Sequence, residues 1–181
     1  MRSGKDLSLV RVADLKLSFA MSPETLDHLA STMHDNYRRN AKANGWPLKP
    51  ELDVPFAGLS PDMQEANRAA ARRISEVLGV IGVRILPHEQ VKTGGLTGAE
   101  FHELVEERME PLAIAEHEGW MRQRIGAGWS YAPKRDDAKK HHPCMVPFSE
   151  LTEEDKEKDR NQVRSYPALF AEAGLVAVKE L

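Results

Sequence analysis

The chain has 181 residues, of which 41% are hydrophobic and 29% charged, and its formal net charge is −3. This length supports a substantial core without a stapling metal, and the single Cys144 excludes a disulfide within the chain. Interspersed charges without a basic stripe argue against polymeric nucleic acid as a partner. Because the first residues lack the apolar segment of a signal peptide, and no apolar run approaches the roughly 18 residues of a membrane span, we expect a cytoplasmic protein without a membrane anchor.

The first half of the chain predicts an arm, helices and one strand. Apolar and polar residues alternate in part over residues 7–19, as in a strand or an arm laid on the core. Ser22 and Pro23 are typical of a helix start, and apolar residues follow at helical spacing until Gly45 ends the run. The later elements predicted for this half are a helix from Pro61 to about Arg72, a short helix from Ser75 to Gly82 and a strand over 83–86.

The second half repeats this plan after a joint over residues 87–96. Thr97 and Glu100 have the spacing of a capping box, and a helix continues past Pro111, which can kink or restart it, to Gly126. The later elements predicted here are a charged helix from Thr152 toward Arg164, a short helix from Pro167 to Gly174 and a strand over 175–178. The predicted fold is mainly α, or α+β with a few short strands.

One sequence pattern occurs twice. Residues 29–46 share Leu-Ala, His, aromatic, Arg and Gly-Trp positions with residues 112–129, and residues 54–82 share Val-Pro-Phe, Leu, Glu, Arg, Arg and Gly positions with residues 146–174. The offset grows from 83 to 92 positions, so the second copy holds nine more residues between Trp129 and Val146. Duplicated units commonly pack about a pseudo-two-fold axis with a ligand in the seam. We expect two such repeats in one domain: an arm over 1–21, repeats over 22–86 and 97–181, and a linker over 87–96.

Several motifs carry a family resemblance. The second copy reads His117-Glu118-Gly119-Trp120, then Gly-Trp-Ser-Tyr-Ala-Pro-Lys-Arg-Asp-Asp-Ala-Lys over 128–139, His-Pro-Cys-Met-Val-Pro-Phe over 142–148, and Asp159-Arg160. This resembles the ryanodine-receptor repeat, or RyR domain, which occurs in tandem pairs in calcium-release channels and in many bacterial and phage proteins. The first copy resembles a degenerate repeat, because Tyr37 replaces the Trp and the Arg-Asp-Asp loop is missing.

The resemblance implies a helical tandem pair with no catalytic role and with an adenine nucleotide in the cleft between repeats. By motif position the base would lie between Trp120 and Tyr37, and Arg135 and His142 would also contact the ligand. Where the family has Gly after the loop Tyr, this chain has Ala132.

Elementary chemistry favours the same site. Stacking between aromatic faces contributes about 1–3 kcal/mol per base, and guanidinium groups grip phosphate with paired hydrogen bonds. Arg124 follows Trp120 by one helical turn, Arg38 adjoins Tyr37, and Lys139 lies on the added loop. The candidate ligand-binding residues are Tyr37, Arg38, Trp120, Arg124, Tyr131, Arg135, Lys139 and His142.

Simpler interpretations stay open for most of these residues. Tyr37 and Trp120 lie on apolar stripes typical of core, and Tyr131 could anchor the loop. His34 and His117 are typical of structural histidines. Adjacent Asp136 and Asp137 suit ion pairs that order the loop better than a metal or a general base, and neither a metal site nor a catalytic nucleophile is expected.

The sequence therefore predicts a non-enzymatic module that binds an adenine-containing nucleotide without any other cofactor. Its expected role is that of a sensor, a sequestering protein or a partner of a separate effector protein. One alternative is a protein-interaction scaffold that docks a partner through the charged helix over 152–164. Another is a hydrolase that uses Asp136, Asp137 and His142.

Overall fold

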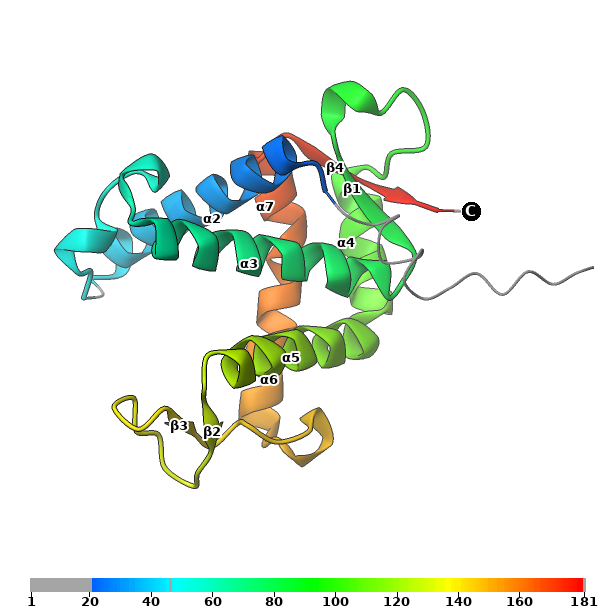
Figure 1. Cartoon of the computed structure of the whole chain (residues 1–181). Helices are drawn as coiled ribbons and strands as arrows, with labels where there is room; N and C mark the ends of the chain where they lie inside the picture. The colour runs from blue at the N-terminus through cyan, green and yellow to red at the C-terminus, as the bar shows by residue number, and fades with distance from the viewer. Residues whose placement is uncertain (1–20, 46, 181) are drawn as a thin grey trace, which may run out of the picture.

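The computed structural model describes residues 21–45 and 47–180, which form a mainly helical fold with two small sheets (Figure 1). The helices are α2 (Pro23–Asn44), α3 (Pro61–Gly79), α4 (Gly98–Glu107), α5 (Met109–Gly126), α6 (Glu153–Arg164) and α7 (Tyr166–Glu172). The strands are β1 (Val83–Pro87), β2 (Ser130–Tyr131), β3 (His141–His142) and β4 (Leu175–Lys179). Short 3-10 helices are η1 (Pro50–Leu52), η2 (Phe56–Gly58), η3 (His88–Gln90) and η4 (Phe148–Glu150). The arm predicted over residues 7–19 lies outside the described residues.

Polar caps open the helices where the sequence predicts them. The Ser22 hydroxyl accepts the Thr25 amide proton at 3.2 Å at the start of α2, and Gly45 closes this helix with a φ of +65°. At α4 the capping box is complete, because Thr97 caps the Glu100 amide while the Glu100 carboxylate accepts from the Thr97 amide. Each cap satisfies amide groups that have no partner inside the helix, so local sequence alone sets these helix starts.

Helix α3 differs from its prediction. The sequence predicts a break between Arg72 and a second helix at Ser75, but α3 runs without interruption from Pro61 to Gly79. Ser75 is buried beside Ile74, and Val77 and Leu78 continue the same buried face. The prediction was wrong because burial of this apolar face outweighs the weak helix preference of serine.

Helices α4 and α5 are two elements rather than one. Helix α4 ends at Glu107, and α5 begins at Met109 with Pro111 in its first turn. A proline is tolerated there because an amide in the first turn has no partner inside the helix. Pro111 therefore restarts the helix, which the sequence left open as an alternative to a kink.

The two predicted strands pair with each other. Strands β1 and β4 are antiparallel, and their register places Ile85 opposite Ala177. These two residues are separated by 92 positions, which is the offset between the downstream parts of the two sequence copies. The second sheet pairs β2 with β3 in parallel within the added segment of the second copy, and the sequence did not predict it.

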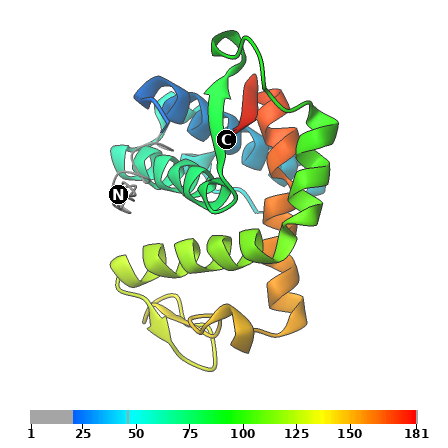
Figure 2. The same cartoon turned by 90° about the vertical axis from the view of Figure 1, so that its right-hand side faces the viewer.

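Helix α3 lies between the other two long helices. It packs against α2 on one side and against α5 on the other (Figures 1 and 2). One hydrophobic core cluster includes Leu29 and Ile74 from the first half of the chain together with Phe101, Tyr166 and Phe170 from the second. Among residues 21–45 and 47–180 no helix is both long enough and apolar enough to cross a lipid bilayer.

Candidate functional site

Helix α5 carries His117 at the start of the second copy's His-Glu-Gly-Trp motif, and both ring nitrogens of this histidine have partners. His117 is buried, and its Nε2 lies 2.8 Å from the Val146 carbonyl oxygen while its Nδ1 lies 3.1 Å from Asp159 Oδ2. Burial lowers the pKa of His117, but the hydrogen bonds to Asp159 and Val146 outweigh it, so the net pKa is raised. Because acceptors face both nitrogens, the ring donates from each when it is protonated, which makes His117 a positioning group.

The ring of Trp120 stacks on His117. We call the group formed by Trp120, Arg124, Trp129 and His142 the aromatic cluster. The Trp120 and His117 ring centroids are 5.7 Å apart at an interplanar angle of 27°. The Arg124 guanidinium carbon lies over both indoles, 5.7 Å from the Trp120 centroid and 4.7 Å from that of Trp129. The His142 ring meets Trp120 edge-on at 5.1 Å and Trp129 at 6.3 Å. Both guanidinium distances fall within the range of cation–π attraction.

His142 has a defined tautomer when neutral. Its Nδ1 accepts the Cys144 backbone N–H at 3.1 Å, so the proton of the neutral ring lies on Nε2. Burial, followed by the positive charges of Arg135 and Arg124, lowers the pKa of His142. The ring is therefore neutral near pH 7 and offers a single Nε2–H donor within the aromatic cluster.

The added segment folds as a loop whose charges largely satisfy one another. The Arg135 guanidinium donates to both carboxylate oxygens of Asp137 at 2.7 and 3.2 Å, and the Lys139 ammonium lies 3.5 Å from Asp136. Strand pairing sets Tyr131 opposite His142, and the Tyr131 side chain is exposed. Two of the predicted phosphate-binding cations, Arg135 and Lys139, thus already have carboxylate partners.

The corresponding residues of the first copy lie elsewhere. Tyr37 is exposed on α2, and Arg38 donates to Asp35 and Asp53 at 3.2 Å each. No ring contact joins Tyr37 to Trp120 within the described part of the chain, because α3 packs between α2 and α5. The structure thus brings together Trp120, Arg124 and His142. Tyr37 and Arg38 lie on α2, which is separated from α5 by α3.

The two copies nevertheless make matching local contacts. His34 Nε2 lies 2.8 Å from the Val54 carbonyl oxygen, as His117 Nε2 does from that of Val146. Arg68 binds Asp27 at 2.5 Å, and at the positions 92 and 83 residues later Arg160 binds Glu110 at 2.7 Å. The repeated sequence pattern therefore repeats as local structure.

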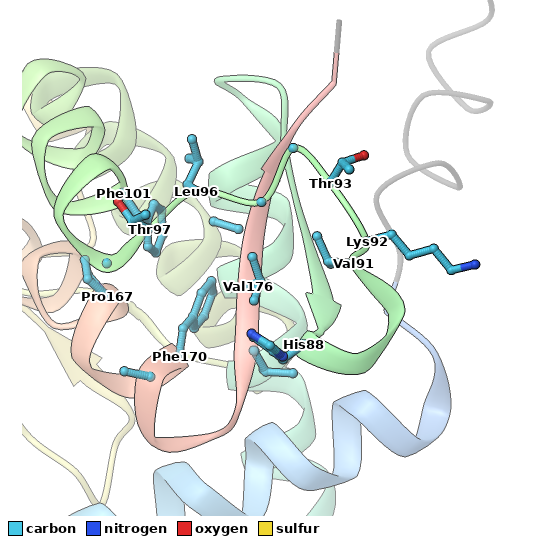
Figure 3. Close-up of a pocket in the computed structure, with 16 residues that line it drawn as sticks. His88, Val91, Lys92, Thr93, Leu96, Thr97, Phe101, Pro167, Phe170 and Val176 are labelled. Atoms are coloured by element: carbon cyan, nitrogen blue, oxygen red, sulfur yellow. The ribbon is translucent and has the colours of Figure 1, made fainter.

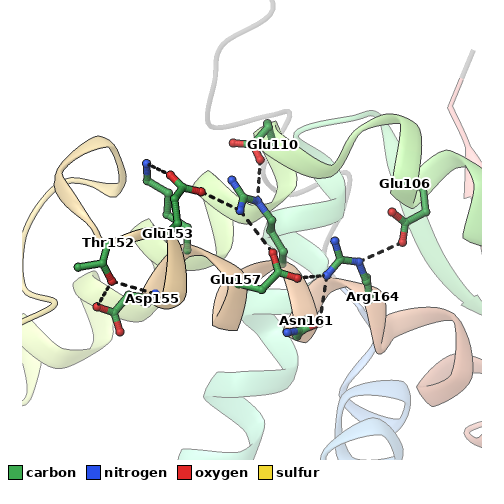
Figure 4. A network of polar contacts seen from close by, with 10 residues as sticks. Glu106, Glu110, Thr152, Glu153, Asp155, Glu157, Asn161 and Arg164 are labelled. Atoms are coloured by element: carbon green, nitrogen blue, oxygen red, sulfur yellow. Dashed lines mark hydrogen bonds and ion pairs between the residues drawn. The ribbon is translucent and has the colours of Figure 1, made fainter.

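The charged side chains of helix α6 form ion pairs within the helix and with neighbouring helices. Figure 4 shows Arg164 between Glu157 of α6 and Glu106 of α4. Arg160 pairs with Glu110 of α5 and with carboxylates of α6 itself. The carboxylates that pair with the two arginines belong to Glu106, Glu110, Glu153 and Glu157. The hydrogen bond to Glu110 is the largest cause that raises the pKa of Arg160, and the hydrogen bonds to Glu153 and Glu157 raise it further. Both arginines of α6 are thus paired within the molecule.

Sequence reasoning missed a buried polar network that joins three helices. Arg73 of α3 donates from Nε to Glu116 at 2.8 Å and from Nη1 to Gln123 at 2.7 Å. The Tyr166 hydroxyl donates to the other Glu116 oxygen at 2.7 Å. The available signal was an acidic residue on the apolar stripe of α5, with Gly119 one turn later.

A pocket of about 450 Å³ lies elsewhere in the molecule, and the sequence did not predict it. The linker, the start of α4, helix α7 and β4 line it, with Phe101, Phe170 and Val176 among its apolar side chains (Figure 3). In Figure 3 the Lys92 side chain extends away from these groups. None of the candidate ligand-binding residues lines this pocket.

These observations define a class: a small, mainly helical module with an aromatic and guanidinium cluster on one helix and its following loop. In the described residues no group of three or more His, Cys, Asp or Glu side chains is placed to hold a metal ion. The model of the RyR domain family matches residues 95–176, which include α4 to α7, the loop and the aromatic cluster. The chain therefore contains a RyR domain.

Proposed function

We propose that the protein is a non-enzymatic binding module for an adenine-containing nucleotide, with the aromatic cluster as its site. The observation that carries this proposal is the meeting of two indoles, a guanidinium and a neutral imidazole donor within one loop and helix. Flat bases gain about 1–3 kcal/mol from each aromatic stack, and a guanidinium binds phosphate oxygens in pairs.

Arg124 is the cation best suited to the phosphate. Four cations were predicted for this role. Within residues 21–45 and 47–180 the Arg124 side chain contacts aromatic rings, whereas each of the other three is paired with a carboxylate. Arg135 and Lys139 would serve at the rim after exchange of exposed ion pairs, which contribute only about 0–1 kcal/mol each. The Nε2–H of His142 would donate to a ligand oxygen or ring nitrogen.

We also infer that the two copies are related by a local two-fold axis near the Ile85 and Ala177 pair. Equivalent residues face each other there, as such an axis requires, and the histidine and arginine contacts of the copies correspond. Only the second copy would bind ligand by this cluster, because Ala41 stands at the position equivalent to Arg124.

Calorimetric titration with ATP, ADP, AMP, ADP-ribose and cyclic nucleotides tests the function. We expect at least one to bind, and Trp120→Ala to weaken that binding by about tenfold or more, which corresponds to about 1.4 kcal/mol. Ile125→Ala, an exposed change on the same helix, is the matched control and should leave affinity unchanged. Circular dichroism shows whether Trp120→Ala is folded, and Trp120→Phe replaces it if it is not.

Three outcomes would contradict the proposal. A wild-type protein that binds none of these compounds has another function, and equal affinity in the wild type and Trp120→Ala places the ligand elsewhere. Nucleotide that disappears during a long incubation with magnesium would indicate turnover and replace the module with an enzyme.

A further inference from the structure

The indole faces that turn toward Arg124 in the aromatic cluster are already occupied. Trp120 is stacked on His117 at 5.7 Å, and the Arg124 guanidinium lies over the Trp120 and Trp129 rings. His142 closes the cluster edge-on. A base that stacks on either indole from the side of Arg124 therefore has to take the place of the guanidinium.

The contacts of Arg124 allow it to move. Its side chain is half-buried, and it follows Trp120 by one turn near the C-terminal end of α5. Within the described part of the chain its contacts are cation–π contacts, whereas Arg135, Arg73 and Arg160 are each held by a carboxylate. A guanidinium that leaves an aromatic face needs a new partner, and an anionic group is the strongest one available.

We propose that Arg124 closes the indole faces in the free protein and yields them only to a ligand that combines a flat ring with an anionic group. This inference rests on the proposed function and adds to it the selection of nucleotides over nucleosides. On binding, the base takes the ring face and the guanidinium moves to the phosphate. A nucleoside offers no such partner, so it has to displace the guanidinium without compensation.

The proposal predicts opposite effects of one substitution on two ligands. Arg124→Ala frees the ring faces and removes the phosphate partner, so affinity for adenosine should rise about threefold while affinity for AMP falls about tenfold. Arg124→Lys keeps the charge without the planar fork, and should retain more AMP affinity than Arg124→Ala. Arg122→Ala is the matched control: it removes an exposed arginine of the same helix that is paired with Glu76, and it should leave adenosine binding unchanged.

Tryptophan fluorescence titrations with adenosine, AMP and inorganic phosphate measure these affinities for the wild type and the three variants. A rise for adenosine together with a fall for AMP in Arg124→Ala supports the proposal. If Arg124→Ala weakens adenosine binding or leaves it unchanged, Arg124 is part of the stack and the proposal is overturned while the proposed function stands. If the wild type binds AMP and every other adenine nucleotide too weakly to detect, the proposed function fails and this inference fails with it.

Discussion

Gly119 lies where Arg73 of α3 crosses α5, and a methyl group there should destabilise the protein. A Cβ on Gly119 would lie 2.6 Å from Arg73 Cδ and 2.8 Å from Cγ, closer than carbon atoms approach in folded proteins. Arg73 cannot simply swing away, because its guanidinium is bonded to Glu116 and Gln123 and its side chain is only 16% exposed. The sequence motif at Gly119 therefore has a packing cause.

The expected magnitude follows from two opposing effects. Replacing glycine by alanine inside a helix stabilises by about 0.5–1 kcal/mol when the methyl group has room. Overpacking a filled contact costs about 1–3 kcal/mol, and displacing Arg73 would also deprive the buried Glu116 of its cation. We expect Gly119→Ala to lower the free energy of unfolding by about 1–2 kcal/mol.

Urea unfolding followed by circular dichroism measures this change. Gly126→Ala is the matched control at the end of the same helix, where a Cβ meets nothing within 4 Å, and it should be neutral or stabilising. In an Arg73→Ala background, Gly119→Ala should lose its cost and become neutral or stabilising. Gly119→Ala as stable as the wild type, or equally costly with and without Arg73, would refute the steric reasoning.

Three further predictions concern buried and capping groups. Because the pKa of His117 is raised in the folded state, its protonated ring stabilises the fold fully below the ordinary pKa of 6.5, and this stabilisation is lost as pH rises through the folded pKa. Asp159→Asn should therefore cost more stability at pH 6 than at pH 9. Equal costs in urea titrations at both pH values would contradict this. Thr97→Ala should lower the free energy of unfolding by about 1 kcal/mol, and an unchanged urea midpoint would count against the cap. Tyr166→Phe removes a hydrogen bond from Glu116 and should cost about 1–3 kcal/mol by thermal unfolding; no loss would show that the bond is dispensable.

Local signals in the sequence predicted most of the fold. Ser22, Ser60, Thr97 and Thr152 each cap the helix that follows, because a cap needs only a hydroxyl and the amides within the next turn. The sequence also predicted the β1 and β4 segments. It failed at Ser75, where burial against the core rather than local preference decides that α3 continues.

The candidate site was predictable only in part. Trp120 and Arg124 lie one helical turn apart, so their proximity follows from helix geometry. The meeting with Trp129 and His142 depends on the path of the loop, and the exclusion of Tyr37 depends on α3 packing between α2 and α5. The ion pairs of Arg135 and Lys139 were expected as loop-ordering contacts, and the structure places them so.

The sequence by itself determined the repeated pattern, the four capped helix starts, strands β1 and β4 and the residue types of the RyR domain, because these depend on neighbours along the chain. Only the tertiary structure decided which copy's aromatic ring joins a cation and a histidine, and which buried carboxylate receives Arg73. Contacts between distant segments depend on how helices fill the space beside one another, and no pattern along the chain encodes that packing directly.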